Sequence, residues 1–301
     1  MKERSLIAFT ILSQLAVGTF WILSGLRFSL ADGDGLSSTA AALDRVFIVI
    51  PVVMILSITA SFLHLGSPRN AWRAVFNVRT SWLSREILFA LLFTLASLFY
   101  AVSQALDLGP LIYQNILVLV SAAFGLGLIV GMSQAYRLRT IPAWDTWQTP
   151  VTFFIATLLL GLLATSGGLV SMRGLIQTQK HTPFIAAYQE LDWILLHRFG
   201  WASAFLACIE LILFRLWLLE LTSGSGAAAE AAARVTRAFR PVLLLRLALS
   251  FAGIIAITWF LLPFGDPTYK SLFFYSAFGL FLSAETLGRF LFYEAQVRVG
   301  V

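Results

Sequence analysis

The residues with the most chemical potential in this sequence are the ionisable side chains that lie within long apolar stretches. A charged side chain at the centre of a bilayer costs on the order of 2.5–3.5 kcal/mol on insertion scales, so such groups face protein, water or a ligand rather than lipid. Those inside the stretches are Glu86, Glu210, Arg215, Arg246, Glu285 and Arg289, and His64 stands at the end of one.

Several of these side chains have a structural interpretation that competes with a functional one. Glu285 and Arg289 stand at positions i and i+4 of one stretch, so they can neutralise each other on a helix. Arg215 and Arg246 can extend along their helices to lipid headgroups. Neither of these explanations applies to Glu210, and we expect it either to pair with a neighbouring arginine or to have a functional role.

The remaining candidates offer little support for a metal or haem centre. His64 can cap a helix end, and Glu86 can be a charge favoured near a helix N-terminus. A bis-histidine haem needs two histidines at similar depth, whereas His181 and His197 belong to the side opposite His64. The lone Cys208 makes no metal site, and the sequence has no P-loop, HExxH or CxxC motif. We therefore expect neither haem nor metal in this chain.

These residues are carried by apolar segments long enough to cross a membrane. Of the 301 residues, 59% are hydrophobic and only 12% are charged, and the mean hydropathy is +0.85. A spanning helix needs about 20 mostly apolar residues. We predict an all-α integral membrane protein, a bundle of about eight transmembrane helices that forms one transmembrane domain over residues 1–301. The predicted spans are 5–26, 46–63, 86–106, 112–132, 150–170, 195–218, 242–262 and 271–292.

Two segments outside these spans are also predicted to be helical. We expect residues 184–192 to form a short helix that lies on the membrane surface. We expect the Ala-rich run 227–238 to form a solvated linker helix, because the Gly/Ser run 222–226 separates it from the span before it.

The distribution of Lys and Arg among the loops predicts the orientation. With eight spans both termini lie on one side, and that side carries thirteen of the 21 basic residues against six on the other. By the positive-inside rule, both termini are cytoplasmic. The basic residues are spread over short loops, so the net charge of +6 does not indicate nucleic-acid binding. In this orientation the buried ionisable groups fall at mid-depth or in the cytoplasmic half, which predicts a polar site near that face.

One part of the sequence resembles a known family of membrane proteins. Residues 61–69 read SFLHLGSPR, and residues 81–86 read SWLSRE. In tandem these segments resemble the membrane anchor subunit of the dimethyl sulfoxide reductase family. Weaker similarities at residues 12–18, 136–150 and 285–293 extend the resemblance from the first predicted span to the last.

The resemblance implies a function and a set of partners. Anchors of this family hold a molybdopterin catalytic subunit and a four-cluster iron–sulfur subunit to the prokaryotic cytoplasmic membrane. They bind a quinol or quinone (menaquinone or ubiquinone), carry no haem, and exchange electrons between the quinone and the iron–sulfur partner. The expected partners are therefore these two subunits and membrane lipid, and the chain itself would carry no complete active site.

The same resemblance associates His64 and Glu86 with the quinone site. Quinol oxidation releases two electrons and two protons, so the ring oxygens need hydrogen-bond partners and the protons need acceptors. A histidine titrates near neutrality, and a partly desolvated carboxyl group can exchange protons in the same range. Because His64 and Glu86 flank one loop, we predict a quinone-headgroup pocket formed by both, with Gly66 and Arg69 nearby.

Two alternatives stay open at this point. Dimethyl sulfoxide reductases place their catalytic subunits outside the cytoplasmic membrane, whereas the loop charges here place His64 inside. A similar anchor serves cytoplasm-facing sulfite-oxidising complexes, in which sulfite gives electrons and quinone accepts them, and the sequence is compatible with both directions. In a different class, the buried charges would line the path of a transporter, although the sequence has no evident inverted repeat.

Overall fold

Long helices make up almost all of the computed structural model, which describes residues 2–30, 46–62, 77–106, 108–177, 183–262 and 267–299. The long helices in chain order are α1 (Lys2–Leu30), α3 (Val49–Phe62), α5 (Trp82–Ala105), α6 (Leu111–Ala135), α7 (Gln148–Gln177), α8 (Pro183–Ser223), α10 (Arg240–Leu261) and α11 (Pro267–Glu294). The short helix α9 (Ala227–Ala233) and the π-helical turn η3 (Arg234–Ala238) connect α8 to α10. The described ranges contain no strand, so the predicted all-α class is confirmed.

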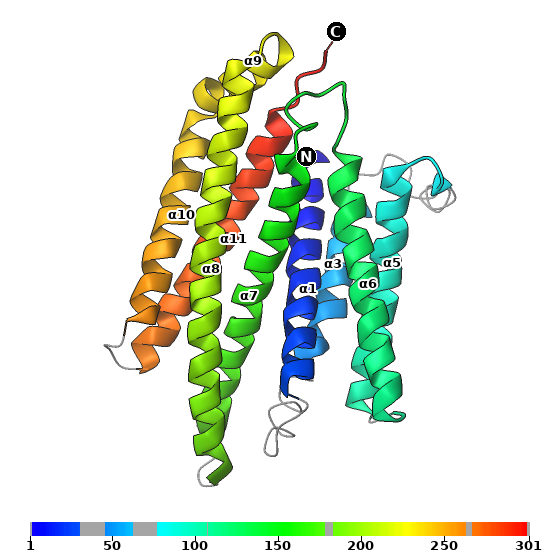
Figure 1. The fold of residues 1–301 in the computed structure, drawn as a ribbon, viewed down its shortest axis with the longest axis vertical. Coiled ribbons are helices and arrows are strands. Elements are labelled where there is room, and N and C mark those ends of the chain that lie inside the picture. The colour runs from blue at the N-terminus through cyan, green and yellow to red at the C-terminus, as the bar shows by residue number, and fades with distance from the viewer. Residues whose placement is uncertain are drawn as a thin grey trace.

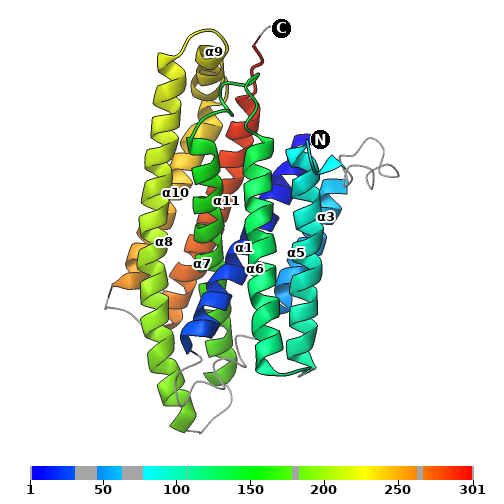
Figure 2. The same cartoon turned by 45° about the vertical axis from the view of Figure 1, so that its right-hand side comes forward.

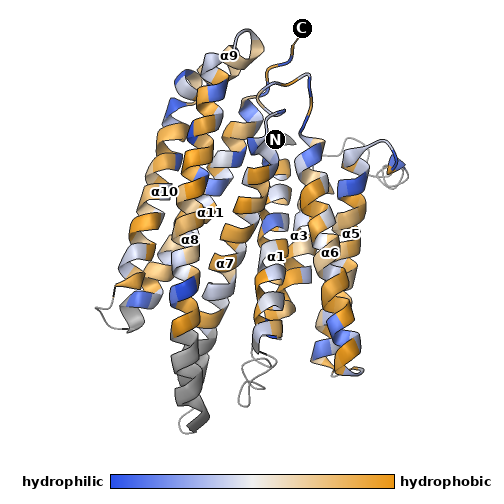
Figure 3. Ribbon diagram, viewed as in Figure 1, coloured by the Kyte–Doolittle hydropathy of each residue, from blue (hydrophilic) through white to orange (hydrophobic). Residues whose placement is uncertain are grey.

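Six of the helices are long and apolar enough to cross a membrane, namely α1, α5, α6, α7, α8 and α10. Hydrophobic residues cover most of their length (Figure 3). The other two predicted spans coincide with α3, which is apolar but has 14 described residues, and with α11, which has 28. Six of the predicted spans are therefore matched by helices of sufficient length and hydropathy, and a total of eight crossings stays a prediction.

Helix α8 differs from its prediction. Its 41 residues correspond to about 60 Å of helix at 1.5 Å per residue, roughly twice the hydrocarbon thickness of a bilayer. The prediction of a separate surface helix over residues 184–192 is wrong, because these residues are the first turns of α8. Pro183 suits the start of a helix, and no glycine or proline interrupts the helix before Gly200. The predicted helix over residues 227–238 is confirmed as α9 followed by η3, but it is not simply a solvated linker, because Ala231, Ala232 and Val235 are buried in the core.

The helices are arranged around the contact of α1 with α7. Helices α3, α5 and α6 lie on one side of this contact, and α8, α10 and α11 lie on the other (Figures 1 and 2). Within these groups α5 packs on α6 and α10 packs on α11. The N- and C-termini lie at the same end of the bundle (Figure 1). We call this end, where α5 and α10 begin and where α8 and α11 finish, the terminal end.

Two glycines allow α1 and α7 to touch through their backbones. A Cβ atom on Gly18 would overlap the carbonyl oxygen of Thr157, and a Cβ atom on Gly161 would overlap the backbone of Gly18. Small residues at such crossings let membrane helices approach closely. Near this crossing, towards the opposite end, an apolar groove of about 350 Å³ lies between α1, α3 and α7, lined by residues such as Leu15 and Ile50.

Candidate functional site

The start of α5 is held by a helix cap and by one arginine. Ser81 is the N-cap, and its hydroxyl accepts a hydrogen bond from the backbone N–H of Ser84 at 3.3 Å. The Arg85 guanidinium donates to the carbonyl oxygens of residues 78 and 79 at 2.7 and 2.9 Å, and it stacks 4.1 Å from the centre of the Trp82 ring. These contacts hold the preceding loop against α5 and place Glu86 in the second turn.

Glu86 is buried where α5 packs against α6. Only 3% of the residue is exposed. Gly131 of α6 lies against its backbone, since a Cβ atom at that glycine would come within 3.1 Å of the Glu86 nitrogen. The absence of a side chain on Gly131 therefore lets the two helices close around the carboxyl group and shield it from lipid.

Glu86 faces a hydrogen-bonded group of side chains from three other parts of the chain. The Tyr293 hydroxyl on α11 donates to the hydroxyl of Tyr136, which follows α6, at 3.1 Å. It also lies 2.9 Å from the hydroxyl of Thr10 on α1. Both tyrosines interact electrostatically with Glu86. Burial, with Tyr293 beside it, raises the pKa of Tyr136 well above its ordinary range, so this phenol keeps its proton.

An aromatic layer surrounds the two tyrosines at the terminal end. The ring of Trp144 stacks on that of Phe292 with centroids 5.5 Å apart, and the Tyr136 ring stacks on Phe153 at 5.7 Å. The Trp144 indole N–H donates to the backbone carbonyl oxygen of Phe292 at 2.6 Å. This packing joins α7, α11 and the segment after α6 into one rigid wall beside Glu86.

Gln14 adds a buried polar atom to the same region. Its amide nitrogen donates to the carbonyl oxygen of Phe153 at 2.8 Å. Its Oε1 atom is buried and has no hydrogen-bond partner among the described residues. Buried polar atoms are usually satisfied, so this oxygen is a candidate acceptor for water or for a ligand. We refer to Thr10, Gln14, Glu86, Tyr136 and Tyr293 together as the Glu86 cluster.

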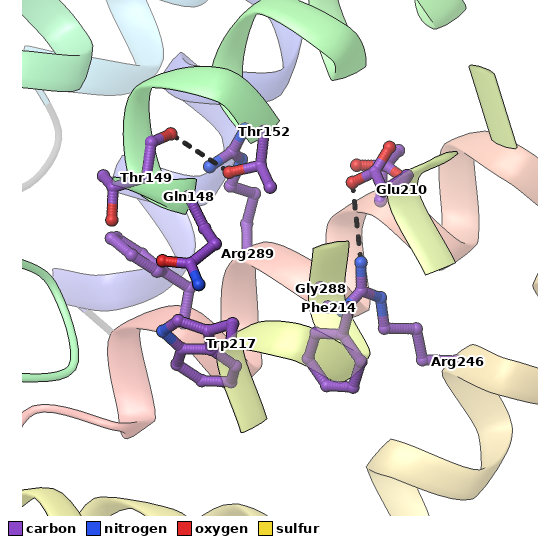
Figure 4. Close-up of a pocket in the computed structure, with 11 residues that line it drawn as sticks. Gln148, Thr149, Thr152, Glu210, Phe214, Trp217, Arg246, Gly288 and Arg289 are labelled. Carbon is purple, nitrogen blue, oxygen red and sulfur yellow. Dashed lines mark hydrogen bonds and ion pairs between the residues drawn. The ribbon is translucent and has the colours of Figure 1, made fainter. Parts of the chain in front are cut away.

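A second polar group lies between α8, α10 and α11. Its four charged residues are each about 5% exposed, and we call them the four-charge cluster: Glu210, Arg246, Glu285 and Arg289. Figure 4 shows the Arg246 guanidinium reaching Glu210, with Nη2 and Oε1 3.5 Å apart. The Arg289 guanidinium lies 3.6 Å from the centre of the Phe153 ring, which borders the Glu86 cluster. The two groups are thus neighbours near the terminal end.

The four-charge cluster lines a small pocket with about 50 Å³ of free space. Helix α7 supplies Gln148, Thr149 and Thr152 to its wall, and α8 supplies Phe214 and Trp217 (Figure 4).

The structure decides between several interpretations of the charged residues. Glu210 does pair with a neighbouring arginine, Arg246. The interpretation that Arg246 extends to lipid headgroups is wrong, because it points inward and stacks 4.1 Å from the Phe214 ring. Arg215 is exposed and remains compatible with headgroup contact. Glu285 and Arg289 attract each other, but both also interact with Glu210, so they do not form an isolated pair.

The predicted quinone pocket is described only in part. His64, Gly66 and Arg69 lie outside the described residues, and the pocket that they were expected to form with Glu86 stays a prediction. Sequence reasoning did not select Gln14, Tyr136 or Tyr293 as site residues. The signal for them was present, because the weaker similarities at residues 12–18, 136–150 and 285–293 contain all three. Within the described ranges, no group of three His, Cys, Asp or Glu side chains is placed to hold a metal ion.

Comparison with known proteins identifies the family of the chain. The family model of the DMSO reductase anchor subunit (DmsC) matches residues 1–295. The anaerobic dimethyl sulfoxide reductase protein YnfH of Escherichia coli is 28% identical over 300 residues, which cover 99% of this chain and 96% of that protein. A component of the anaerobic dimethyl sulfoxide reductase of Haemophilus influenzae is 29% identical over 188 residues, 62% of this chain and 66% of that protein.

A further relative belongs to a sulfite-oxidising system. This component of the sulfite dehydrogenase of Allochromatium vinosum is 38% identical over 74 residues, which cover 25% of this chain and 21% of that protein. The family match, by contrast, runs from the first described helix to the end of the last. With six apolar helices and this match, the chain is a multi-pass membrane protein that belongs to the family of DMSO reductase anchor subunits.

Proposed function

We propose that this protein binds a quinol or quinone at its terminal end and exchanges electrons between that quinone and an iron–sulfur partner. An anchor subunit implies a catalytic and an electron-transfer partner subunit. We propose that these are a molybdopterin subunit and an iron–sulfur subunit with four clusters. The family match favours this role over that of a transporter.

The observation that carries the proposal is the Glu86 cluster. A quinone headgroup presents two ring oxygens that need hydrogen-bond donors when oxidised and proton acceptors when reduced. The cluster supplies a buried carboxyl group, phenol hydroxyls and a buried amide oxygen without a partner among the described residues. Its carboxyl residue, Glu86, follows closely in the sequence after His64 and Arg69. Such a site can bind the headgroup, exclude water and accept protons at defined atoms.

When the complex works as a reductase, quinol is oxidised to quinone at this site. Two electrons pass to the iron–sulfur partner, and two protons pass to acceptors in the pocket, for which we propose His64 and Glu86. The sulfite-oxidising direction reverses each of these transfers. The match to a component of a sulfite dehydrogenase makes this reverse direction the second candidate. Cytoplasmic termini would favour it, because the pocket would then face a cytoplasmic enzyme.

Glu86→Gln tests the proposal in the purified complex or in membranes. We expect quinol-linked or quinone-linked turnover to fall on the order of a hundredfold, because glutamine keeps the volume but cannot accept a proton. Turnover with an artificial dye that reacts directly with the partner subunits should not change. The measurement is the ratio of the two activities in the same preparation.

The matched control is Glu230→Gln on α9. Glu230 is exposed, and its Oε1 atom lies 3.3 Å from Nη2 of Arg234 in a surface ion pair. Its substitution removes one carboxylate without touching the Glu86 cluster, so the ratio should equal that of the unmodified protein. Quinone-linked turnover that survives Glu86→Gln at the control level would refute the role of Glu86.

A further inference from the structure

The four-charge cluster contains more buried polar atoms than its own contacts satisfy. Oε2 of Glu210, Nε of Arg246 and Nε of Arg289 are all buried and have no hydrogen-bond partner within the described part of the protein. Oε1 of Gln148, at the edge of the same pocket, shares this property. Charged groups are rarely buried without partners, because the cost of removing them from water is large. Pocket water, or a proton shared between neighbouring carboxyl groups, would satisfy these atoms.

Two carboxyl groups of the cluster lie side by side. Glu210 and Glu285 line the same small pocket and are each about 5% exposed, and the two interact electrostatically. Two buried carboxylates that face one pocket repel each other and cannot hydrogen-bond to each other, since each only accepts. One proton held between them removes the repulsion and supplies the missing donor. The pair then carries one negative charge opposite two arginines.

The pocket has room for water beside this pair. A water molecule needs roughly 10–15 Å³ of such space and two to four polar partners. The pocket offers about 50 Å³, and its wall carries the unsatisfied atoms of Glu210, Arg246 and Arg289. A few waters would therefore fit and would connect the carboxyl pair to the side chains of α7.

A polar route leads from the pocket to the surface at the terminal end. Gln148 lines the pocket, and its amide nitrogen donates to Oε2 of Glu220 at 2.7 Å. Glu220 is exposed and lies in the last turn of α8. Water in the pocket would stand one side chain away from a surface carboxylate, which is a suitable place for protons to enter or leave.

The cluster also borders the Glu86 cluster. Arg289 interacts electrostatically with Tyr293, whose hydroxyl is bonded to Tyr136. Both tyrosines interact with Glu86. Arg289 and Tyr293 are therefore the residues through which the two clusters adjoin.

We propose that Glu210 and Glu285 form a second functional site, a carboxyl pair that holds one shared proton and exchanges it with the terminal end through pocket water, Gln148 and Glu220. Among the described residues that line the pocket, the other charged groups are Arg246 from α10 and Arg289 from α11, and α7 contributes Gln148, Thr149 and Thr152, which carry no charge. The carboxyl pair can hold its proton whether or not the protein binds a quinone. The further step, in which the pair accepts protons from Glu86, rests on the proposed function.

Infrared difference spectroscopy of the full-length protein in lipid nanodiscs tests the shared proton. A protonated carboxyl group has a C=O band separate from that of a carboxylate, and the band shifts when D₂O replaces H₂O. We expect one such band to vanish in Glu210→Gln and also in Glu285→Gln, and to remain in Glu86→Gln. If both pair variants retain every protonated-carboxyl band of the unmodified protein, the pair holds no proton and the proposal is overturned.

A second variant tests the route without altering a buried charge. Gln148→Leu removes the amide that links the pocket to Glu220 and leaves that carboxylate exposed to water. We expect the band of the pair to persist but its exchange with D₂O to slow, whereas an unchanged exchange rate would overturn the route. Quinone-linked turnover separates this proposal from the previous one. Full turnover in Glu86→Gln with the pair band present would refute only the quinone role of Glu86.

Discussion

Replacing Gly18 by alanine should prevent normal packing of the bundle. The new methyl group would overlap the carbonyl oxygen of Thr157, which belongs to the backbone of α7 and cannot rotate away. Overpacking against side chains typically costs about 1–3 kcal/mol, and a clash with backbone should lie at or above the upper end of that range. We expect much less protein to accumulate in membranes and a lower unfolding temperature of the purified protein.

Gly25→Ala is the matched control for this substitution. Gly25 lies on the same helix, and a Cβ atom there would meet nothing within 4 Å. Alanine also favours helix over glycine by roughly 0.8–1.0 kcal/mol, so this variant should be at least as stable as the unmodified protein. Equal unfolding temperatures for the Gly18 and Gly25 variants would contradict the close contact of α1 with α7.

Removing both carboxyl groups of the four-charge cluster should be far more damaging than removing either one. With a shared proton, the Glu210 and Glu285 pair carries one negative charge, and each single Glu→Gln variant keeps one. The double variant removes the last negative charge that faces Arg246 and Arg289 in the cluster, which should cost about 3–5 kcal/mol. We expect small changes in unfolding temperature for the single variants and a large decrease for the double variant.

The unfolding temperatures of the two single variants and the double variant together distinguish a shared proton from two ionised carboxylates. If both carboxylates were ionised in the unmodified protein, each single substitution would leave one arginine without a counter-charge, and the two effects would add. Additive losses of similar size would therefore contradict a shared proton. Thermal unfolding followed by tryptophan fluorescence in the same detergent measures all three variants under equal conditions.

The sequence predicted the helices better than the contacts between them. Long apolar runs are visible without a structure, because a bilayer requires about 20 apolar residues per crossing. The continuity of α8 through residues 184–192 was missed, since amphipathic composition does not reveal whether a helix ends at the membrane surface. Single-sequence hydropathy also does not show which helices are neighbours, and α1 meets α7 through Gly18 and Gly161 only in the folded bundle.

The candidate site was likewise predictable from the sequence only in part. Glu86 was one of several ionisable side chains that the sequence places in apolar stretches, and the family resemblance singled it out as a residue of the quinone site. Its neighbours Thr10, Tyr136 and Tyr293 are separated from it by many residues, and their hydroxyl groups are unremarkable one by one. Only the packing of α1, α5, α6 and α11 brings them together. The inward orientation of Arg246 was likewise a property of packing, since an arginine near a helix end can equally extend to the headgroups.

Photolabelling with a light-activated quinone analogue would locate the quinone site. The purified complex is illuminated with the analogue, digested, and analysed by mass spectrometry for labelled peptides. We expect label in peptides that carry residues 61–86 or line the Glu86 cluster, and loss of that label when excess natural quinone competes. Label confined to the apolar groove between α1, α3 and α7, with none at the terminal end, would contradict a quinone site at Glu86.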